Sequence, residues 1–396
     1  MALHFDCNAT TAASPEVIEA MLPWLGRPGA NPSATHPAGR EAGRAVRDAR
    51  TDVAQLIGGP PPSSIVFTSC GSESTITAIR SAAVRNPSGK AVLSSAEHSA
   101  TVKAVSACFG GAESSDSRTI RIPVDARGHL DRSALFDALE SGDVALVSLI
   151  LLNNETGVIS DLSGIGEACR AAGALFHIDA VQAPAKTPID VAVLDCDFLS
   201  LSGHKFHGPR GIGALYVRGG VPVESLIVGG PQEGERRAGT ENVPAIVGLG
   251  VAAKAAAERS VDAAAQAGMA SSRDRLESKI LTGCPGSWVN GDVERRAANT
   301  SNIGFDLAAT GLDATALLAL LHDQGIEVSA GSACNSSKSA PSAVLRAMGQ
   351  DDAKAASALR FSLAHQGTPD AVSPDEVDAC GQAVIEAHQA LMGLSI

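Results

Sequence analysis

Aromatic residues are scarce in this 396-residue chain, where Phe, Tyr and Trp together make up 3% of the sequence. A hydrophobic core must therefore be built mainly from Ala, Val, Leu and Ile. A hydrophobic content of 44% is enough for a core larger than one domain usually holds. The chain also has no excess of basic residues. Its net charge of −12 argues against nucleic acid or an anionic membrane as a partner.

Long apolar runs and closely spaced cysteines are missing as well. No run approaches the roughly 20 residues that a bilayer span requires. The first residues, MALHFDCNATTAA, do not place an apolar segment after a basic one, as a signal peptide does. The eight cysteines contain no C-x-x-C pair, which is typical of a reduced cytoplasm rather than of a disulfide framework or a structural zinc site. We therefore expect a cytoplasmic protein with no intrinsic metal site.

Alternating segments between residues 64 and 218 indicate the fold class. Ala-rich stretches with helical periodicity lie between several β-branched runs, which predicts an α/β fold with a mostly parallel sheet and helices on both faces. The runs that read as buried strands are SIVFTSC, KAVLSSA, TIRIPV, VALVSLILLNN, GALFHIDA, FLSLSG and GALYVR. Residues 244–280 predict one long connecting helix, and the segments after it predict a smaller α+β domain.

Polar clusters follow several of these predicted strands. They are TSCGSES, AEHS, NNETG, HIDAVQ and SGHK. Each one alone is explained as a turn or a helix cap. Ligands of open parallel sheets bind beyond the carboxyl ends of the strands, however, and five such ends share one rim. The sequence therefore predicts a binding site there.

Lys205 stands at one of these strand ends, in LSLSGHKFHGPRG. It could simply be a solvated lysine, but a partly desolvated amine is what Schiff-base chemistry with an aldehyde cofactor needs. Pyridoxal 5'-phosphate (PLP) also requires an acid against its ring nitrogen, and Asp179 in FHIDAVQ is the candidate. Its phosphate requires several donors and preferably a helix N-terminus. The candidate donors are Gly71, Ser72, Ser202 and His204.

The order of these motifs resembles that of cysteine desulfurases, which are PLP enzymes of the aspartate-aminotransferase fold type (fold type I). The matching segments are IVFTSCGSES, AEHS, NNETG, FHIDAVQA, SGHK, RRAGTEN, GSAC and LRFSL. The similarity runs from NATT at residue 8 to about residue 365. FTSCG, NNETG and RRAGTENVPAIVGLGVAA are most similar to the nitrogen-fixation (NifS) branch. The resemblance implies a large PLP-binding domain with a seven-stranded sheet over 13–257, and a small domain over 1–12 and 258–396.

The resemblance also implies a role for each matching residue. Lys205 would hold PLP as a Schiff base and move protons, and His98 would stack on the PLP ring. Gln182 would donate to the phenolic oxygen of PLP, and Thr240 would reach the phosphate from the other subunit of a homodimer. The full cofactor-binding set is Gly71, Ser72, His98, Asn154, Asp179, Gln182, Ser202, Gly203, His204, Lys205 and Thr240.

The substrate and the nucleophile follow from the same resemblance. Asn31 and Arg360 would hold the carboxylate of L-cysteine, and a planar guanidinium independently suits bidentate carboxylate binding. Cys334, in VSAGSACNSSKSAPS, would take the substrate sulfur as a persulfide and leave L-alanine. A bystander cysteine in a loop is the simpler alternative. The small residues around Cys334 predict a loop that carries the sulfur to an acceptor protein.

The implied pathway is iron–sulfur cluster assembly, with nitrogenase as the destination on the NifS branch. The partner would be an iron–sulfur scaffold or another persulfide acceptor, and Cys334 could transiently ligate a cluster shared with that scaffold. A selenocysteine lyase or another PLP lyase of the same fold is an alternative. A non-catalytic assembly scaffold is a further one, against which the presence of Lys205, Asp179 and His98 argues. The sequence departs from the family at Cys7, where Asn is more common, and at His365 and Ser72.

Overall fold

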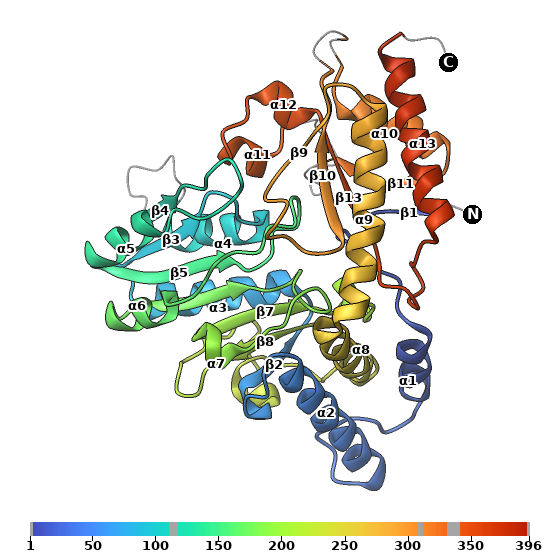
Figure 1. Cartoon of the computed structure of the whole chain (residues 1–396). Helices are drawn as coiled ribbons and strands as arrows, with labels where there is room; N and C mark the ends of the chain where they lie inside the picture. Colours follow the sequence, from blue (N-terminus) through green and yellow to red (C-terminus); the bar gives the residue numbers. More distant parts are fainter. Residues whose placement is uncertain (1–2, 111–117, 308–309, 311, 331–340, 394–396) are drawn as a thin grey trace.

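The computed structural model describes residues 3–110, 118–307, 310, 312–330 and 341–393. A large sheet with helices on both sides makes up one part of the molecule, and a smaller sheet flanked by long helices makes up the other (Figure 1). The large sheet has seven strands. In order across the sheet they are β2 (Ile65–Thr68), β8 (Gly213–Val217), β7 (Phe198–Ser202), β6 (Leu175–Asp179), β5 (Val144–Ile150), β3 (Lys90–Ser94) and β4 (Thr119–Ile122).

Only β8 runs antiparallel to its two neighbours in this sheet, and the other pairs are parallel. The predicted seven-stranded, mostly parallel α/β fold is therefore confirmed. Every residue of β5, β6, β7 and β8 is buried, which explains why these strands read as continuous apolar runs rather than as alternating ones.

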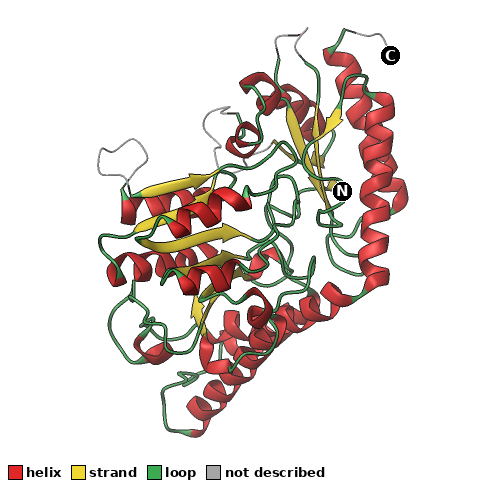
Figure 2. Ribbon diagram, turned by 60° about the vertical axis from the view of Figure 1, so that its left-hand side comes forward, coloured by secondary structure: helices red, strands yellow, loops and turns green. Residues whose placement is uncertain are grey.

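Two layers of helices bury the faces of the large sheet (Figure 2). Side chains alternate along each strand, so Val66 packs in the core under one layer while Ile65 and Phe67 pack in the core under the other. The first layer consists of α3 (Gly71–Arg85) and α4 (Ser99–Phe109). The second consists of α2 (Pro37–Leu56), α5 (Arg132–Glu140), α6 (Ile165–Ala171), α7 (Val191–Leu194) and α8 (Val243–Val261), and α1 (Pro15–Leu25) packs on α8.

The smaller sheet is antiparallel and has its own core. Its strands are, in order, β12 (Ser329–Ala330), β13 (Ala358–Ser362), β10 (Thr300–Gly304) and β9 (Trp288–Val289). Next to it, β1 (Leu3–His4) pairs with β11 (Ile326–Glu327). The helices of this part are α9 (Ala263–Gly283), α10 (Ala314–Asp323), α11 (Ala343–Ala347), α12 (Asp352–Ala356) and α13 (Pro374–Leu391). Phe5 packs in this core, whereas Val17 packs in the core of the large sheet. The domain limits 13–257 and 1–12 with 258–396 stay a prediction.

The single helix predicted over 244–280 is wrong. Two helices, α8 and α9, meet at Asp262, whose extended backbone ends the first helix. The Asp262 side chain accepts hydrogen bonds from the backbone N–H groups of Ala264 and Ala265, so it caps the second helix. An aspartate is a preferred N-cap, and this one divides a segment of continuous helical composition.

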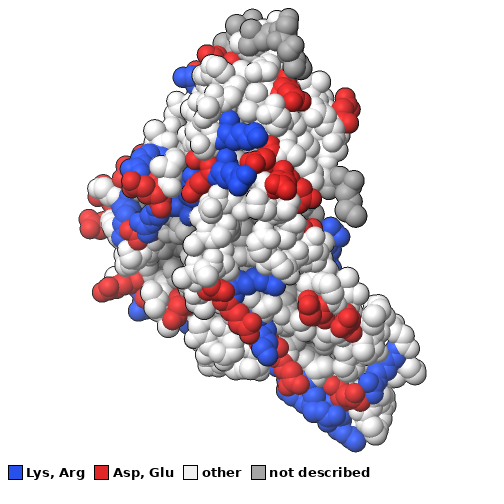
Figure 3. All heavy atoms as spheres, turned by 45° about the vertical axis from the view of Figure 1, so that its right-hand side comes forward, with Lys and Arg blue, Asp and Glu red and all other residues white. Residues whose placement is uncertain are grey.

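Charged groups are dispersed over the face of the molecule that Figure 3 draws. On the face drawn in Figure 3, acidic and basic side chains lie next to one another between larger areas without charge. Among the described residues, no helix is both long enough and apolar enough to cross a bilayer. Three short 3-10 helices complete the described structure: η1 (Pro62–Ser64), η2 (Gly203–Lys205) and η3 (Gln232–Glu235).

Candidate active site

A cavity of about 550 Å³ lies beyond the carboxyl ends of the central strands. The last residues of β5, β6 and β7 line it, together with the first residues of α3 and α4. The small-sheet part contributes Arg360 from β13 and Val344 from α11, so the cavity lies between the two sheets. Ten predicted site residues line it: Gly71, Ser72, His98, Asn154, Asp179, Gln182, Ser202, His204, Lys205 and Arg360.

Lys205 belongs to η2, the turn that directly follows β7. Its Nζ donates hydrogen bonds to the backbone carbonyl oxygens of Asn8, at 2.6 Å, and of Ala9, at 2.8 Å. The tight packing of Gly203 fixes this turn, because a Cβ there would lie 3.0 Å from the Pro209 carbonyl oxygen. The amine is therefore held at the wall of the cavity at the place that the sequence predicted.

Asp179 and His98 are two further ionisable groups that line the cavity. Burial raises the pKa of the Asp179 carboxyl, and His98 and Lys205 act against that rise. Burial lowers the pKa of His98, whose Nδ1 accepts a hydrogen bond from the Ala100 N–H at 3.2 Å. A neutral His98 therefore carries its proton on Nε2. A positively charged ring nitrogen near Asp179 would lower the pKa of that carboxyl again.

The N-terminus of α3 faces the cavity through Gly71 and Ser72. Cys70 is its N-cap and makes no side-chain capping hydrogen bond, so the first backbone N–H groups of the helix have no cap from that residue. A Cβ on Gly71 would lie 2.6 Å from Val181 Cγ2, so only glycine fits at this close approach. Such a helix end suits a phosphate.

Arg360 is the largest fully buried side chain among the described residues. Its Nη2 pairs with Asp6 at 2.5 Å, and its Nη1 donates to the Asn154 carbonyl oxygen at 3.1 Å. Its Nε has no hydrogen-bond partner among the described residues. A buried cation with an unused donor at the edge of the cavity suits an incoming carboxylate.

Asn8 is a site residue that the sequence analysis did not single out. Its side chain donates to Thr300 Oγ1 at 2.9 Å and to the Asn154 carbonyl oxygen at 3.2 Å. Its Oδ1 accepts from Asn299 Nδ2 at 3.1 Å and from Lys186 Nζ at 3.0 Å. Asn8 therefore joins the large sheet to the small one directly beneath Lys205. The only available signal was its place at the start of the NATT motif.

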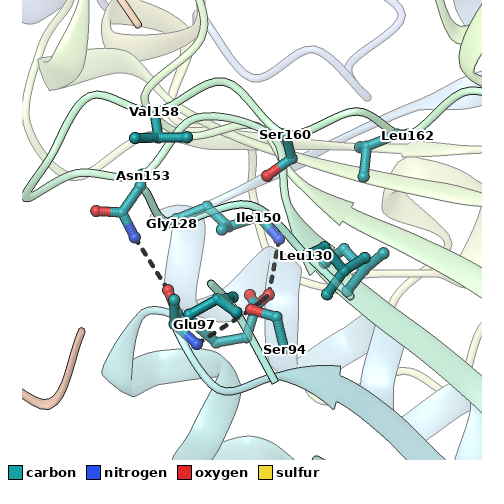
Figure 4. Close-up of a pocket in the computed structure, with 12 residues that line it drawn as sticks. Ser94, Glu97, Gly128, Leu130, Ile150, Asn153, Val158, Ser160 and Leu162 are labelled. Carbon is teal, nitrogen blue, oxygen red and sulfur yellow. Dashed lines mark hydrogen bonds between the residues drawn. The ribbon is translucent and has the colours of Figure 1, made fainter. Parts of the chain in front are cut away.

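Glu97 is a second residue of this kind. It lines the large cavity and also a small cavity of about 20 Å³ behind it, which Figure 4 shows. Its Oε1 accepts from Ser94 Oγ at 2.8 Å and from the Ile150 N–H at 3.0 Å, while Oε2 has no partner among the described residues. Desolvation by burial raises the pKa of Glu97 to about 8, so the carboxyl is mostly protonated at neutral pH.

Three described residues of the predicted set, Gly203, Asn31 and Thr240, do not line the cavity of their own chain. Asn31 lies exposed between α1 and α2, where its Oδ1 accepts from the Ser33 N–H, and Thr240 lies exposed before α8. Cys334 lies outside the described residues. After that segment, Pro341 lines the cavity and the Ser342 hydroxyl donates to Glu155.

A second group of side chains has the chemistry of metal ligands. Ligand atoms of His4, Cys7 and Asp370 lie within 4.8 Å of one another. His4 Nδ1 is 2.8 Å from Glu327, and Asp370 accepts the Ala12 N–H at 2.7 Å. Two of the three groups therefore have partners in the protein already. The expectation of no intrinsic metal site stays a prediction.

A sheet of this topology, with a lysine after one strand and a carboxylate at the end of its neighbour, defines the PLP-dependent fold type I class. The aminotransferase class-V model matches residues 3–374. The cysteine desulfurase of Cereibacter sphaeroides is 46% identical over 92% of this chain and 92% of that protein. The cysteine desulfurase NifS of Azotobacter vinelandii is 41% identical over 93% and 90%. A solved NifS-like protein superposes with a TM-score of 0.84 at 32% identity, over 98% and 99%. The chain belongs to the aminotransferase class-V family.

Proposed function

We propose that this protein is a cysteine desulfurase that uses PLP and forms a persulfide on Cys334. The observation that carries the proposal is that Lys205, from the large sheet, and Arg360, from the small sheet, line one cavity. A Schiff-base amine and a carboxylate-binding guanidinium then face the same substrate. The relatives with 41–46% identity over more than nine-tenths of the chain support this activity.

The residues of the cavity fit PLP by their chemistry. Lys205 would hold it covalently, and the Asp179 carboxylate would contact its ring nitrogen. Gln182 would donate to its phenolic oxygen, and the N-terminus of α3 with Ser202 and His204 would hold the phosphate. Bound PLP supplies an electron sink that makes the Cα–H bond of an attached amino acid acidic.

The chain itself would bind the substrate, move protons and accept the sulfur. Arg360 would bind the substrate carboxylate, and the Lys205 amine would transfer protons at Cα and Cβ. The Cys334 thiolate attacks the substrate sulfur, so the S–S bond forms as the Cβ–S bond breaks, and the electron pair left on Cβ takes a proton to give L-alanine. His98, with its proton on Nε2 when neutral, lies in the cavity as the proton donor or acceptor for this step.

Sulfur on Cys334 would then pass to an acceptor protein for iron–sulfur cluster assembly. The NifS relative supports a role in supplying nitrogenase. We further propose that the protein is a homodimer, because Thr240 and Asn31 do not line the cavity of their own chain and a second subunit could supply both. We also propose that it is cytoplasmic.

The test measures L-alanine released from L-cysteine in the presence of a small thiol reductant, and borohydride reduction maps the attached cofactor. Wild-type protein should release alanine, and the label should be found on Lys205. Lys205→Ala should lose both alanine release and labelling, whereas Lys354→Ala, a change at an exposed lysine of the small-sheet part, should keep them. A label on another lysine, or alanine release by Lys205→Ala, would contradict the proposal.

A further inference from the structure

A second lysine, Lys186, lies directly behind the proposed cofactor site. It follows β6 by a few residues, in a turn in which Ala185 has a positive φ of 65°. The residue keeps some exposed surface, but its Nζ points inward and donates to two side-chain oxygens, Gln182 Oε1 at 2.7 Å and Asn8 Oδ1 at 3.0 Å. Desolvation by burial, together with a smaller effect of the nearby Lys205, lowers the pKa of Lys186 to about 7.

The contact with Lys186 determines which way the Gln182 amide faces. An amine of lysine offers donors to its neighbours in the folded protein, so it meets the amide oxygen and not the amide nitrogen. Gln182 Nε2 is thereby turned to the opposite side, where it donates to the Asn8 carbonyl oxygen at 2.8 Å. One N–H of this nitrogen is left, and Gln182 lines the large cavity. Without Lys186, the two orientations of the amide would differ less in energy, and an oxygen could face the cavity in place of the donor.

Lys186 and Lys205 are also joined through one residue. Asn8 accepts from Lys186 on its side-chain oxygen and from Lys205 on its backbone oxygen, at 3.0 and 2.6 Å. Below its pKa of about 7, the charged Lys186 amine therefore lies behind the carbonyl group against which the Lys205 amine rests. A like charge at this distance disfavours a second positive charge at Lys205.

We propose that Lys186 is a positioning residue for the reaction at Lys205. It fixes Gln182 with its N–H toward the cavity, and it holds Asn8 in place beneath the Lys205 amine. This inference rests on the proposed function, in which Gln182 donates to the phenolic oxygen of PLP. It adds a residue that acts on the cofactor only through its neighbours.

Other charged groups surround Lys186 and enter any pH dependence. Cys7, Lys205 and Arg360 act on its charge. Lys186 acts in turn on His207 and His365, both of which have a pKa lowered by burial. These groups come from the N-terminal segment, from the turn after β7, and from β13 and the segment after it. Because Lys186 acts on them as well as on Gln182, the effect on the amide is isolated by comparing Lys186→Met with Gln182→Leu and with the double variant.

The test is an absorbance titration of the holoenzyme, because the visible band of a PLP Schiff base changes when the Schiff base loses its proton. Lys186→Met removes the cation and the donors, so the midpoint should rise, on the order of one pH unit, since a protonated Schiff base is no longer repelled. Lys186→Arg should restore most of the wild-type midpoint. Lys254→Met, at an exposed lysine of α8, is the matched control and should titrate as wild type does. Gln182→Leu should raise the midpoint too, and the double variant should shift by less than the sum.

The outcomes separate the inference from the proposed function. A Lys186→Met protein that holds PLP on Lys205 and has the wild-type midpoint would overturn the positioning role and leave the proposed function intact. If Lys186→Met does not retain PLP, the same comparison is made on Lys186→Gln, with the same rise expected. Failure of both neutral variants to fold, with Lys186→Arg folded, would assign Lys186 to stability alone and would equally overturn the inference. Absence of PLP from the wild type would instead contradict the proposed function.

Discussion

Arg360, which is buried and lines the proposed active site, forms an ion pair at 2.5 Å with the partly exposed Asp6. The pair joins β13 to the N-terminal segment across 354 residues of sequence. Asp6 binds Nη2 and leaves the Nε of Arg360 without a partner among the described residues. Asp6 therefore holds the guanidinium in place, because without Asp6 the buried Arg360 cation would have no charged partner. In the proposed function, a substrate carboxylate would then meet an arginine whose position is already fixed.

This arrangement predicts a binding defect for Arg360→Lys. A lysine keeps the charge but loses the planar fork, so the KM for L-cysteine should rise about 10- to 100-fold, the equivalent of one to two charge-assisted hydrogen bonds. Bound PLP should not change. Arg346→Lys, at an exposed arginine of α11 that pairs with Asp352, is the control and should leave KM unchanged. An unchanged KM in Arg360→Lys would remove this residue from substrate binding.

The raised pKa of the buried Glu97 carboxyl predicts that the stability of the protein depends on pH. Its pKa is about 8 in the folded protein against the ordinary value of 4.5, so the unfolded chain ionises this carboxyl at a lower pH than the folded protein does. The stabilisation that Glu97 gives is therefore complete below about pH 4.5 and is lost as the pH rises to about 8. A glutamine does not ionise, so the Glu97→Gln variant does not lose this stabilisation as the pH rises. The free energy of unfolding of the variant, relative to wild type, should rise by a few kcal/mol between pH 5 and pH 8.

Urea unfolding at the two pH values measures this difference. Glu140→Gln, at an exposed position on α5, should show no such change relative to wild type. Parallel stability curves for wild type and Glu97→Gln would mean that the Glu97 carboxyl is ionised in the folded protein at neutral pH.

The position of Thr240 predicts an active site that is shared between subunits. It lies exposed and outside the cavity of its own chain, although Arg237, three residues earlier, pairs with Glu73 in the first turn of α3 at 3.1 Å. Thr240→Ala and Lys205→Ala proteins should each have low activity as homodimers. After subunit exchange, one site of each hybrid contains neither change, so alanine release should recover toward about a quarter of the wild-type rate for random mixing. No recovery in a mixture proven to contain hybrids would place Thr240 in its own subunit's site.

Periodicity and strand ends made much of the site predictable from the sequence. Fully buried parallel strands read as apolar runs, and the residues at or just beyond their carboxyl ends, such as Asp179 and Lys205, meet at one rim. The roles of Asn8, Asp6 and Lys186 could not be predicted from these patterns. The Asn8 contact with Lys205 spans 197 residues, and no local pattern encodes it. Glu97 escaped because a carboxyl after a strand reads as a solvated turn residue, and only packing shows that it is buried and protonated.

The structure also bears on which thiol is the nucleophile. Cys70 lines the large cavity together with Lys205. Cys7 lies next to Asn8 and lines a small cavity that Lys205 also lines, so it is a second described cysteine that could substitute for Cys334. It is 2% exposed, and burial together with Asp370 raises the pKa of its thiol far above the ordinary value. A buried thiol held in its neutral form is a poor nucleophile.

Cys7→Ala should therefore keep nearly wild-type alanine release. Cys334→Ala should lose it by at least about 10³-fold while it still binds PLP. Mass spectrometry after brief exposure to L-cysteine should find the extra sulfur on Cys334 in the wild type and in Cys7→Ala. A persulfide on Cys7, or substantial turnover by Cys334→Ala, would contradict this assignment.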